Sequence, residues 1–284
     1  MKINFTKMHG IGNDYVYVDC MQNELKNPEE VSIAVSPRHF SVGSDGLILV
    51  CKSDVADAKM RIFNADGSEA KMCGNGIRCV GKFLYDKGYV DKTEITVDSM
   101  SGIKKLKLNV IDGKVDTVTV DMGKAILESG QIPVVYDEPT MINKPVMVNG
   151  KEYNITAVSM GNPHAVVFMD DVDSLDLGKI GPYFENLDIF PDRVNTEFIK
   201  VIDDKTLQMR VWERGSGETF ACGTGTCASV VAACLNGICK ADTDVIVNLI
   251  GGDLIIRYCA DGTVFMTGKA ETSYEGGFEY EYKN

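Results

Sequence analysis

The sequence predicts an α+β fold made of two similar domains, each a mixed sheet or barrel wrapped around one central helix, with an active-site cleft between them. Two observations predict this architecture. One set of motifs occurs twice along the chain in a single register, and in each copy a run with helical spacing follows a Cys-Gly-x-Gly turn that is flanked by strand-like segments. A repeat of this kind is typical of a structural duplication.

The repeat has an offset of 149 residues. Met60 to Gly76 and Met209 to Gly225 share six identities in 17 positions without a gap. The same offset superposes Gly12-Asn13 on Gly161-Asn162 and also aligns glycines outside these blocks. A single register that extends over about 100 residues indicates that the second half copies the first.

Each copy predicts the same order of elements. Alternating or β-branched runs indicate strands, and the run after the Cys-Gly-x-Gly turn indicates a helix that closes at a glycine. In the first copy the strands are expected at 15–18, 47–50, 59–63, 95–97, 105–110 and 115–120, with the helix between Cys73 and Gly88. In the second copy they are expected at 165–168, 198–202, 207–212, 245–250, 254–258 and 263–267, with the helix ending at Gly237.

The central helix and the domain limits follow from this pattern. The run Ala228 to Leu235 is apolar nearly all round, which predicts a helix buried inside a sheet. The proline-containing segment 124–151 is expected to be a connection without a counterpart, and the tail from Ala270 is expected to add a strand back to the first domain. We therefore place the domains at 1–120 with 270–284, and at 121–269.

Composition excludes several classes of protein. The 41 acidic residues outnumber the 29 basic residues and give a net charge of −12, whereas binding to a nucleic acid backbone needs a basic face. No run approaches the 18 or more apolar residues of a membrane span, and the start lacks the long apolar core of a secretory signal. A cytoplasmic protein without nucleic acid or membrane partners is expected.

The nine cysteines are the unusual feature of this composition. An odd number without a secretory signal favours reduced thiols over a disulfide framework. The close spacings are C-x5-C, C-x4-C, C-x6-C and C-x4-C, which are not the repeated C-x2-C pairs of a zinc site, so no metal site is expected. Most of the cysteines are expected to pack as small apolar residues.

Cys73 and Cys222 are different because each lies at the start of a predicted helix, on matched positions of the repeat. Free amide N–H groups and the positive end of the helix dipole stabilise a thiolate there, so we expect a lowered cysteine pKa. If both thiols reach one substrate carbon, one removes the α-proton and the other protonates the opposite face. The two thiols would titrate as a coupled unit, and the same amides could hold the reacting carboxylate.

Two other interpretations of these motifs are possible. The segment from Gly223 to Ala228 fits a loose G-x-G-x-x-A dinucleotide pattern, but the first copy breaks the pattern and no parallel βαβ unit surrounds it. A carboxylate-binding protein without turnover is expected to lose one of the two cysteines, and both are present. No signature of a cofactor is found, so a cofactor-free reaction is preferred.

Five sequence blocks resemble the diaminopimelate epimerase family and occur in the order found there. They are MHGIGNDYVYVD (8–19), FNADGSEAKMCGNGIRC (63–79), GNPHAVVF (161–168), NTEFI (195–199) and ERGSGETFACGTGTCA (213–228). The resemblance implies a cofactor-independent isomerase that interconverts LL- and meso-diaminopimelate in lysine and peptidoglycan precursor synthesis, with homodimers common.

The resemblance also implies the roles of individual residues. Cys73 and Cys222 would be the acid–base pair, with His164 and Glu213 as supports for the thiols. The residues implied to bind the substrate are Asn13, Asn64, Gly74, Asn75, Asn162, Asn195, Glu213, Arg214, Gly223 and Thr224. Several fall on matched positions of the repeat, such as Asn13 with Asn162 and Asn64 with Glu213.

One position departs from the family pattern. Many members carry Gln where this chain has Gly46, which removes a polar contact and leaves the fine specificity open. The alternative enzyme is another two-cysteine racemase on the same scaffold, acting on proline-like or other amino acids. Arg214 and the several asparagines favour a substrate with two amino acid ends.

Overall fold

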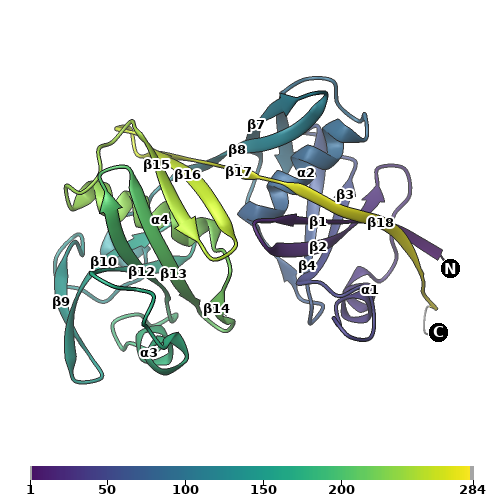
Figure 1. Ribbon diagram of the computed structural model, residues 1–284. Coiled ribbons are helices and arrows are strands. Elements are labelled where there is room, and N and C mark those ends of the chain that lie inside the picture. Colours follow the sequence, from purple (N-terminus) through teal and green to yellow (C-terminus); the bar gives the residue numbers. More distant parts are fainter. Residues whose placement is uncertain (1, 282–284) are drawn as a thin grey trace. The chain divides into compact units, whose positions relative to one another are not determined.

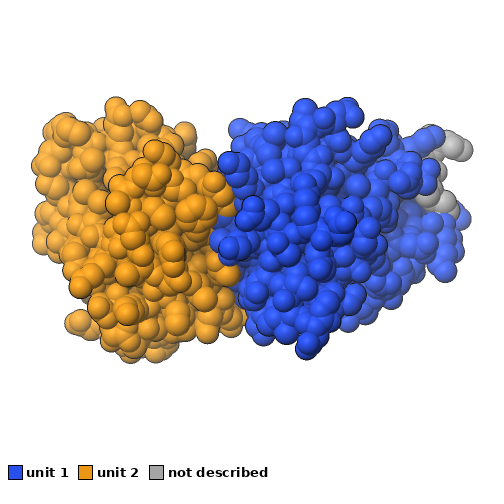
Figure 2. All heavy atoms as spheres, turned by 90° about the horizontal axis from the view of Figure 1, so that it is seen from above, with its two compact units in different colours: residues 1–120, 268–284 blue, residues 121–267 orange. Residues whose placement is uncertain are grey.

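The computed structural model describes residues 2–281 and divides the chain into two compact units. Unit 1 comprises residues 1–120 and 268–284, and unit 2 comprises residues 121–267. Figure 2 colours the two units separately, and Figure 1 labels their helices and strands. The chain crosses from one unit to the other within two long strands, at residues 114–124 and 263–269.

Unit 1 consists mostly of strands, with two helices. Its elements are β1 (Lys2–Gly10), β2 (Asn13–Cys20), α1 (Pro28–Val35), β3 (Gly46–Cys51), β4 (Ala58–Asn64), β5 (Glu69–Ala70), α2 (Gly74–Asp86), β6 (Glu94–Asp98), β7 (Lys104–Ile111), the first part of β8 (Lys114–Lys124) and β18 (Glu271–Glu279). Neighbouring pairs are mostly antiparallel, but β2 with β3 and β4 with β6 are parallel, so the sheet is mixed.

Unit 2 repeats this order. Its elements are η1 (Ser129–Gln131), β9 (Lys144–Val148), β10 (Lys151–Ser159), β11 (Pro163–Met169), α3 (Leu177–Glu185), β12 (Asn195–Asp203), β13 (Thr206–Glu213), β14 (Gly217–Thr219), α4 (Gly223–Leu235), β15 (Asp244–Leu249), β16 (Gly252–Tyr258) and β17 (Thr263–Lys269). Adding 149 to the bounds of β1 and of α2 gives the bounds of β10 and of α4. The parallel pairs recur as β11 with β12 and β13 with β15.

Helices α2 and α4 are the centres of their units, as the apolar pattern predicts. Ten of the 13 residues of each helix are buried. A Cβ on Gly81 of α2 would lie 3.0 Å from side-chain atoms of both Leu106 and Leu108, so α2 packs closely against β7. In unit 2, the Ser229 hydroxyl of α4 donates to Met209 Sδ on β13 at 3.3 Å. The predicted fold class, a duplicated mixed sheet around central helices, is confirmed.

The tail forms the predicted strand, because β18 pairs antiparallel with β1 along nearly its whole length. The expectation for 124–151 was wrong in part. This segment contains β9, which pairs with β10 as β18 pairs with β1. It also supplies Ile132, Val134 and Met141 to the core of unit 2. The offset did not reveal this counterpart because the equivalent strand of unit 1 lies at the other end of the chain.

Helices α1 and α3, which the sequence pattern did not predict, also occupy equivalent positions. Helix α3 lies against the aromatic end of β13, where the Trp212 indole N–H donates to Glu185 Oε2 at 2.7 Å. An added Cβ on Gly181 would lie 2.2 Å from the Trp212 ring. Such close approach requires glycine at this position of the helix.

We expect Gly181→Ala to lower the free energy of unfolding by about 1–3 kcal/mol, because a methyl group has no room against Trp212. Gly178→Ala is the matched control in the same helix, since the nearest atom to its Cβ is Asp176 Oδ1 at 3.5 Å. That change should leave stability unchanged or raise it by up to about 1 kcal/mol. Urea unfolding of both variants checks the pair, and an equally stable Gly181→Ala protein would contradict the close packing.

Candidate active site

Cys73 is the N-cap residue of α2. Its backbone is extended, with φ −138° and ψ 114°, and its Sγ accepts a hydrogen bond from Gly76 N at 3.2 Å. The strand before it and the helix after it therefore fix the sulfur over the first turn, where helix amides point outward. Gly74 and Asn75, both predicted to bind substrate, are the first two residues of this turn and are buried.

Cys222 has the same geometry at the start of α4. Its φ and ψ are −119° and 108°, and its Sγ accepts from Gly225 N at 3.3 Å. Thr224, in the same turn as Gly223, places its Oγ1 3.5 Å from the sulfur. The two thiols expected to be reactive are thus both helix caps, in equivalent positions of the two units.

Cys73 lies among polar side chains. Its thiol donates to Asn13 Oδ1 at 3.2 Å, and Asn13 Nδ2 donates to Asp45 Oδ2 at 2.8 Å. Tyr15 is buried beside them, and burial, together with Cys73 and Asp45, raises the pKa of its hydroxyl well above the usual value. Asn64 lies at the end of β4, where its Nδ2 donates to Ser68 Oγ at 3.0 Å.

Gly46 stands opposite Asn64 in the β3–β4 pair. Its φ is +156°, and a Cβ built there would lie 2.1 Å from the carbonyl oxygen of Phe63. The backbone of this chain therefore leaves no space for a side chain at position 46. The matched residue of unit 2 is Asn195, which is buried and accepts from Arg214 N at 2.9 Å.

A buried pair of a histidine and a carboxylate lies in unit 2. His164 and Glu197 are both fully buried, and His164 Nδ1 is 2.7 Å from Glu197 Oε1. The other ring nitrogen, Nε2, is 3.1 Å from Asn162 Oδ1. Glu197 was not among the predicted site residues. A signal was available, because the matched residue of the first copy is Ile48, so a carboxylate replaces an apolar side chain in the middle of a strand.

Glu213 is the last residue of β13, and Arg214 follows it directly. The Thr219 hydroxyl donates to Glu213 Oε1, and burial raises the pKa of the Glu213 carboxyl, although hydrogen bonds from Thr219 and Cys222 partly offset this. The Arg214 guanidinium donates to the carbonyl oxygen of Asp192 at 2.7 Å. The hydrogen bond between Glu213 and Cys222 places these two side chains next to each other in unit 2.

The expected lowering of the cysteine pKa is wrong for Cys222. Burial raises the pKa of the Cys222 thiol well above its usual value, and the nearby Glu213 and Glu197 carboxylates raise it further. The hydrogen bonds from Thr224 and Gly225 act in the opposite direction but are smaller effects. Desolvation and two buried acids therefore raise the pKa of the Cys222 thiol by more than the helix N-terminus lowers it.

The structure groups the predicted residues into two half-sites, one in each unit. The Cys73 half-site contains Asn13, Gly74 and Asn75, and Asn64 lies in the same unit, bonded to Ser68. The Cys222 half-site contains Glu213, Thr224 and Gly223, while Asn162 is bonded to His164 and Asn195 to the Arg214 backbone. Among residues 2–281 no cluster of three or more potential ligands suits a metal ion, and no helix is long and apolar enough to cross a membrane.

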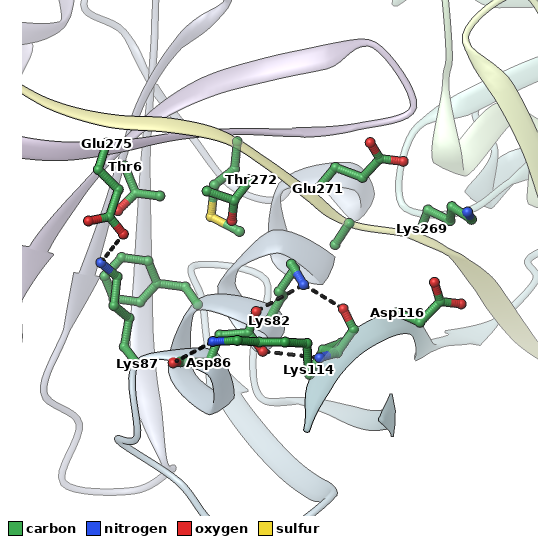
Figure 3. Close-up of a pocket in the computed structure, with 14 residues that line it drawn as sticks. Thr6, Lys82, Asp86, Lys87, Lys114, Asp116, Lys269, Glu271, Thr272 and Glu275 are labelled. Carbon is green, nitrogen blue, oxygen red and sulfur yellow. Dashed lines mark hydrogen bonds and ion pairs between the residues drawn. The ribbon is translucent and has the colours of Figure 1, made fainter. Parts of the chain in front are cut away.

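A separate groove of about 590 Å³ lies in unit 1 between α2, β1, β8 and β18 (Figure 3). It is lined by Lys82 and Asp86, which form an ion pair at 2.9 Å, and by Lys87 and Glu275, which form another. None of the predicted site residues lines it. Because no predicted site residue reaches this groove, we do not assign it as the active site.

Comparison with known proteins agrees with the motifs. A family model described as diaminopimelate epimerase matches residues 5–128 and 156–273. The diaminopimelate epimerase of Agathobacter rectalis is 55% identical over 282 residues, which covers 96% of this chain and 98% of that protein. The diaminopimelate epimerase of Acetivibrio thermocellus is 54% identical over 275 residues, with 96% and 98% coverage.

Two solved structures share the fold at low identity. A hydroxyproline epimerase from Agrobacterium vitis has a TM-score of 0.70 at 17% identity and covers 97% of this chain and 92% of its own. A Bacillus anthracis phenazine biosynthesis protein of the PhzF family has a TM-score of 0.69 at 16% identity, with 99% and 100% coverage. At this level of identity the two structures inform the fold alone.

We expect Glu213→Gln to shift the pH dependence of Cys222 alkylation to lower pH. The variant removes a negative charge that raises the pKa of the thiol, so the reactive thiolate forms at lower pH. Iodoacetamide labelling followed by peptide mass spectrometry measures the midpoint for Cys222 alone. Glu138→Gln, an exposed carboxylate of the same unit paired with Lys144, is the control and should not move it. A midpoint that stays in place or rises in Glu213→Gln would contradict the electrostatic assignment.

Proposed function

The chain belongs to the diaminopimelate epimerase family, and we propose from this premise that it interconverts LL- and meso-diaminopimelate with Cys73 and Cys222 as its acid–base pair. It is an isomerase with a small-molecule substrate. The observation that carries the site assignment is the matched pair of cysteine caps. Two thiols at equivalent positions of a duplicated fold, each over a helix N-terminus, are what a two-base inversion requires.

In the proposed reaction, one sulfur removes the proton from the α-carbon as the other donates a proton to its opposite face. The C–H bond electrons remain on the substrate as charge that spreads onto the α-carboxylate. Outward-facing amides at Gly74, Asn75, Gly223 and Thr224 would bind that carboxylate and stabilise the charge where it develops. No electron sink beyond these amides is needed in the proposal. The reverse reaction exchanges the roles of the two sulfurs.

Productive turnover needs one thiolate and one thiol. The raised pKa of Cys222 favours the thiol form there, so we assign Cys222 as the proton donor when the cycle begins from that state. The thiolate is then on Cys73. Glu213, bonded to Cys222 through its carboxyl, and the buried His164 would support the thiol chemistry of this half-site.

The remaining polar residues would read the rest of the substrate. Glu213 and Asn64 stand at matched positions that would accept the reacting ammonium group. Asn13, Asn162, Asn195 and Arg214 would bind the other polar groups, including the distal amino acid end. Arginine is suited to this task because its planar guanidinium binds a carboxylate through two parallel hydrogen bonds.

A cytoplasmic place of action and a homodimeric assembly complete the proposal. The first follows from the biosynthetic role, and the second is implied by the family. Sedimentation equilibrium of the purified protein tests the dimer directly. A single species with the mass of a monomer would contradict the proposed dimer.

Incubation of LL-diaminopimelate with the protein in deuterated water, with a reducing agent present, tests the activity. Each inversion should return a solvent deuteron to the α-carbon, so the meso product should carry one α-deuterium detectable by mass spectrometry and NMR. Proline and hydroxyproline serve as parallel substrates. Exchange with either of these, and none with diaminopimelate, would assign the chain to the alternative racemases.

Cys73→Ala and Cys222→Ala should each lower kcat for epimerisation by at least about 10²–10⁴-fold, because each removes one of the two proton-transfer groups. Cys79→Ala in α2 and Cys227→Ala in α4 are the matched controls, since both side chains are fully buried in the same helices. The controls should keep nearly full activity. If either variant at the capping cysteines turns over at the rate of its control, the two-base mechanism is wrong. Circular dichroism verifies that all four variants are folded.

A further inference from the structure

The pair formed by His164 and Glu197 needs an explanation, because a buried ion pair is not in general a source of stability. Both side chains are fully excluded from solvent and lie on the neighbouring parallel strands β11 and β12. His164 Nδ1 and Glu197 Oε1 are 2.7 Å apart. At this distance the imidazole and the carboxyl group form a direct hydrogen bond.

Glu197 also lies against the cap of Cys222. A Cβ built on Gly225 would be 2.3 Å from Glu197 Oε1, and Gly225 N is the donor to Cys222 Sγ at 3.3 Å. Only glycine at position 225 leaves room for the carboxylate. Glu197 Oε2 has no hydrogen-bond partner within the described part of the chain. One oxygen of this buried carboxylate therefore stays without a hydrogen bond from the described residues, so hydrogen bonding alone does not explain its position.

Unit 1 shows that packing alone does not call for a carboxylate here. The offset of 149 residues matches Glu197 with Ile48 and His164 with Tyr15. A Cβ on Gly76, the counterpart of Gly225, would lie 2.7 Å from Ile48 Cδ1. An apolar side chain thus fills the same place under the equivalent helix, where it supports the same cysteine cap.

We propose that Glu197 is a positioning residue of the Cys222 half-site, which orients the His164 ring through Nδ1 and thereby fixes the side chain of Asn162. This inference rests on the proposed function. A carboxylate that binds one nitrogen of a histidine sets the tautomer and direction of the ring. The second nitrogen, Nε2, lies 3.1 Å from Oδ1 of the Asn162 amide, so the direction of the ring also determines where this amide is held.

The same carboxylate contributes to the charge around Cys222. The groups that face this thiol are Glu213 from β13, Glu197 from β12 and Thr224 from the first turn of α4, and His164 on β11 acts on Glu213. If Cys222 is the proton donor, activity falls at high pH as this thiol loses its proton. Loss of the Glu197 charge should therefore move the alkaline limb of the kcat/KM profile to lower pH.

Glu197→Gln tests the proposal, because it keeps the size of the side chain but removes its charge. We expect kcat to fall by about 10–100-fold, as for other carboxylates that orient a functional histidine, with a smaller change in KM. Thr196→Val is the matched control, since Thr196 is a fully buried neighbour on β12 whose hydroxyl has no hydrogen-bond partner in the described region. It should keep the wild-type pH profile.

A double-mutant cycle separates positioning from general support of the fold. If Glu197 acts through His164, then Glu197→Gln should have little further effect on kcat in a His164→Asn background. Additive losses would overturn the inference. An unshifted alkaline limb together with wild-type kcat in Glu197→Gln would overturn it as well.

Imidazole ¹⁵N NMR gives a readout that is independent of turnover. The chain has three histidines, so His9 and His39 are internal references for His164. Glu197→Gln should change the Nδ1 and Nε2 shifts of His164 alone, and unchanged shifts would contradict the proposal. Glu197→Asp, which keeps the charge but shortens the reach, should produce a similar change and serves if the first variant does not fold. If the wild-type protein does not turn over diaminopimelate, but Glu197→Gln still changes the His164 shifts, the proposed function is refuted and the positioning role stands.

Discussion

The hydrogen bond from a backbone amide to a cysteine sulfur at the start of each central helix is the interaction on which both half-sites depend. Gly76 N binds Cys73 Sγ, and Gly225 N binds Cys222 Sγ, at nearly the same distance. This bond fixes the sulfur relative to the helix, and the surrounding strands fix the helix. A side chain on either glycine would collide with the strand behind it. The position of each sulfur is therefore set by the whole unit.

The duplication preserved this geometry while the electrostatics of the two copies became different. Behind Cys73 the helix rests on Ile48, and its polar neighbours are Asn13 and Tyr15. Behind Cys222 it rests on Glu197, with Glu213 and His164 nearby. The two thiols thus share one backbone geometry but lie among different side chains.

Much of this could be predicted from the sequence. The repeat, the central helices and the cysteine caps depend on local patterns and on one offset, and the structure agrees with the predicted fold class. Helices α1 and α3 were missed because eight or nine residues carry too little periodicity, and Pro182 stands inside α3. Strand β9 was missed because Pro145 lies inside it, two further prolines precede it, and its counterpart is the distant strand β18. The structural repeat thus includes elements that the sequence repeat does not reveal.

The electrostatics of the site could not be predicted in the same way. A helix N-terminus is visible in a sequence, whereas burial and the approach of Glu197 from a neighbouring strand depend on tertiary structure. The predicted lowering of the Cys222 pKa failed for this reason. Glu197 was part of a quoted motif, but its importance depends on a distance to His164 that only the folded chain reveals.

The pairing of β18 with β1 has a consequence for synthesis of the protein. Unit 2 is one continuous stretch, so all of its strands have been made once residue 267 leaves the ribosome. In unit 1, β1 pairs with β2 on one side, but its other partner, β18, is translated only after the whole of unit 2. Domains usually fold in the order of their synthesis, from the N-terminus. Here the order is reversed, and we expect the unit that begins the chain to be the second to reach its final form.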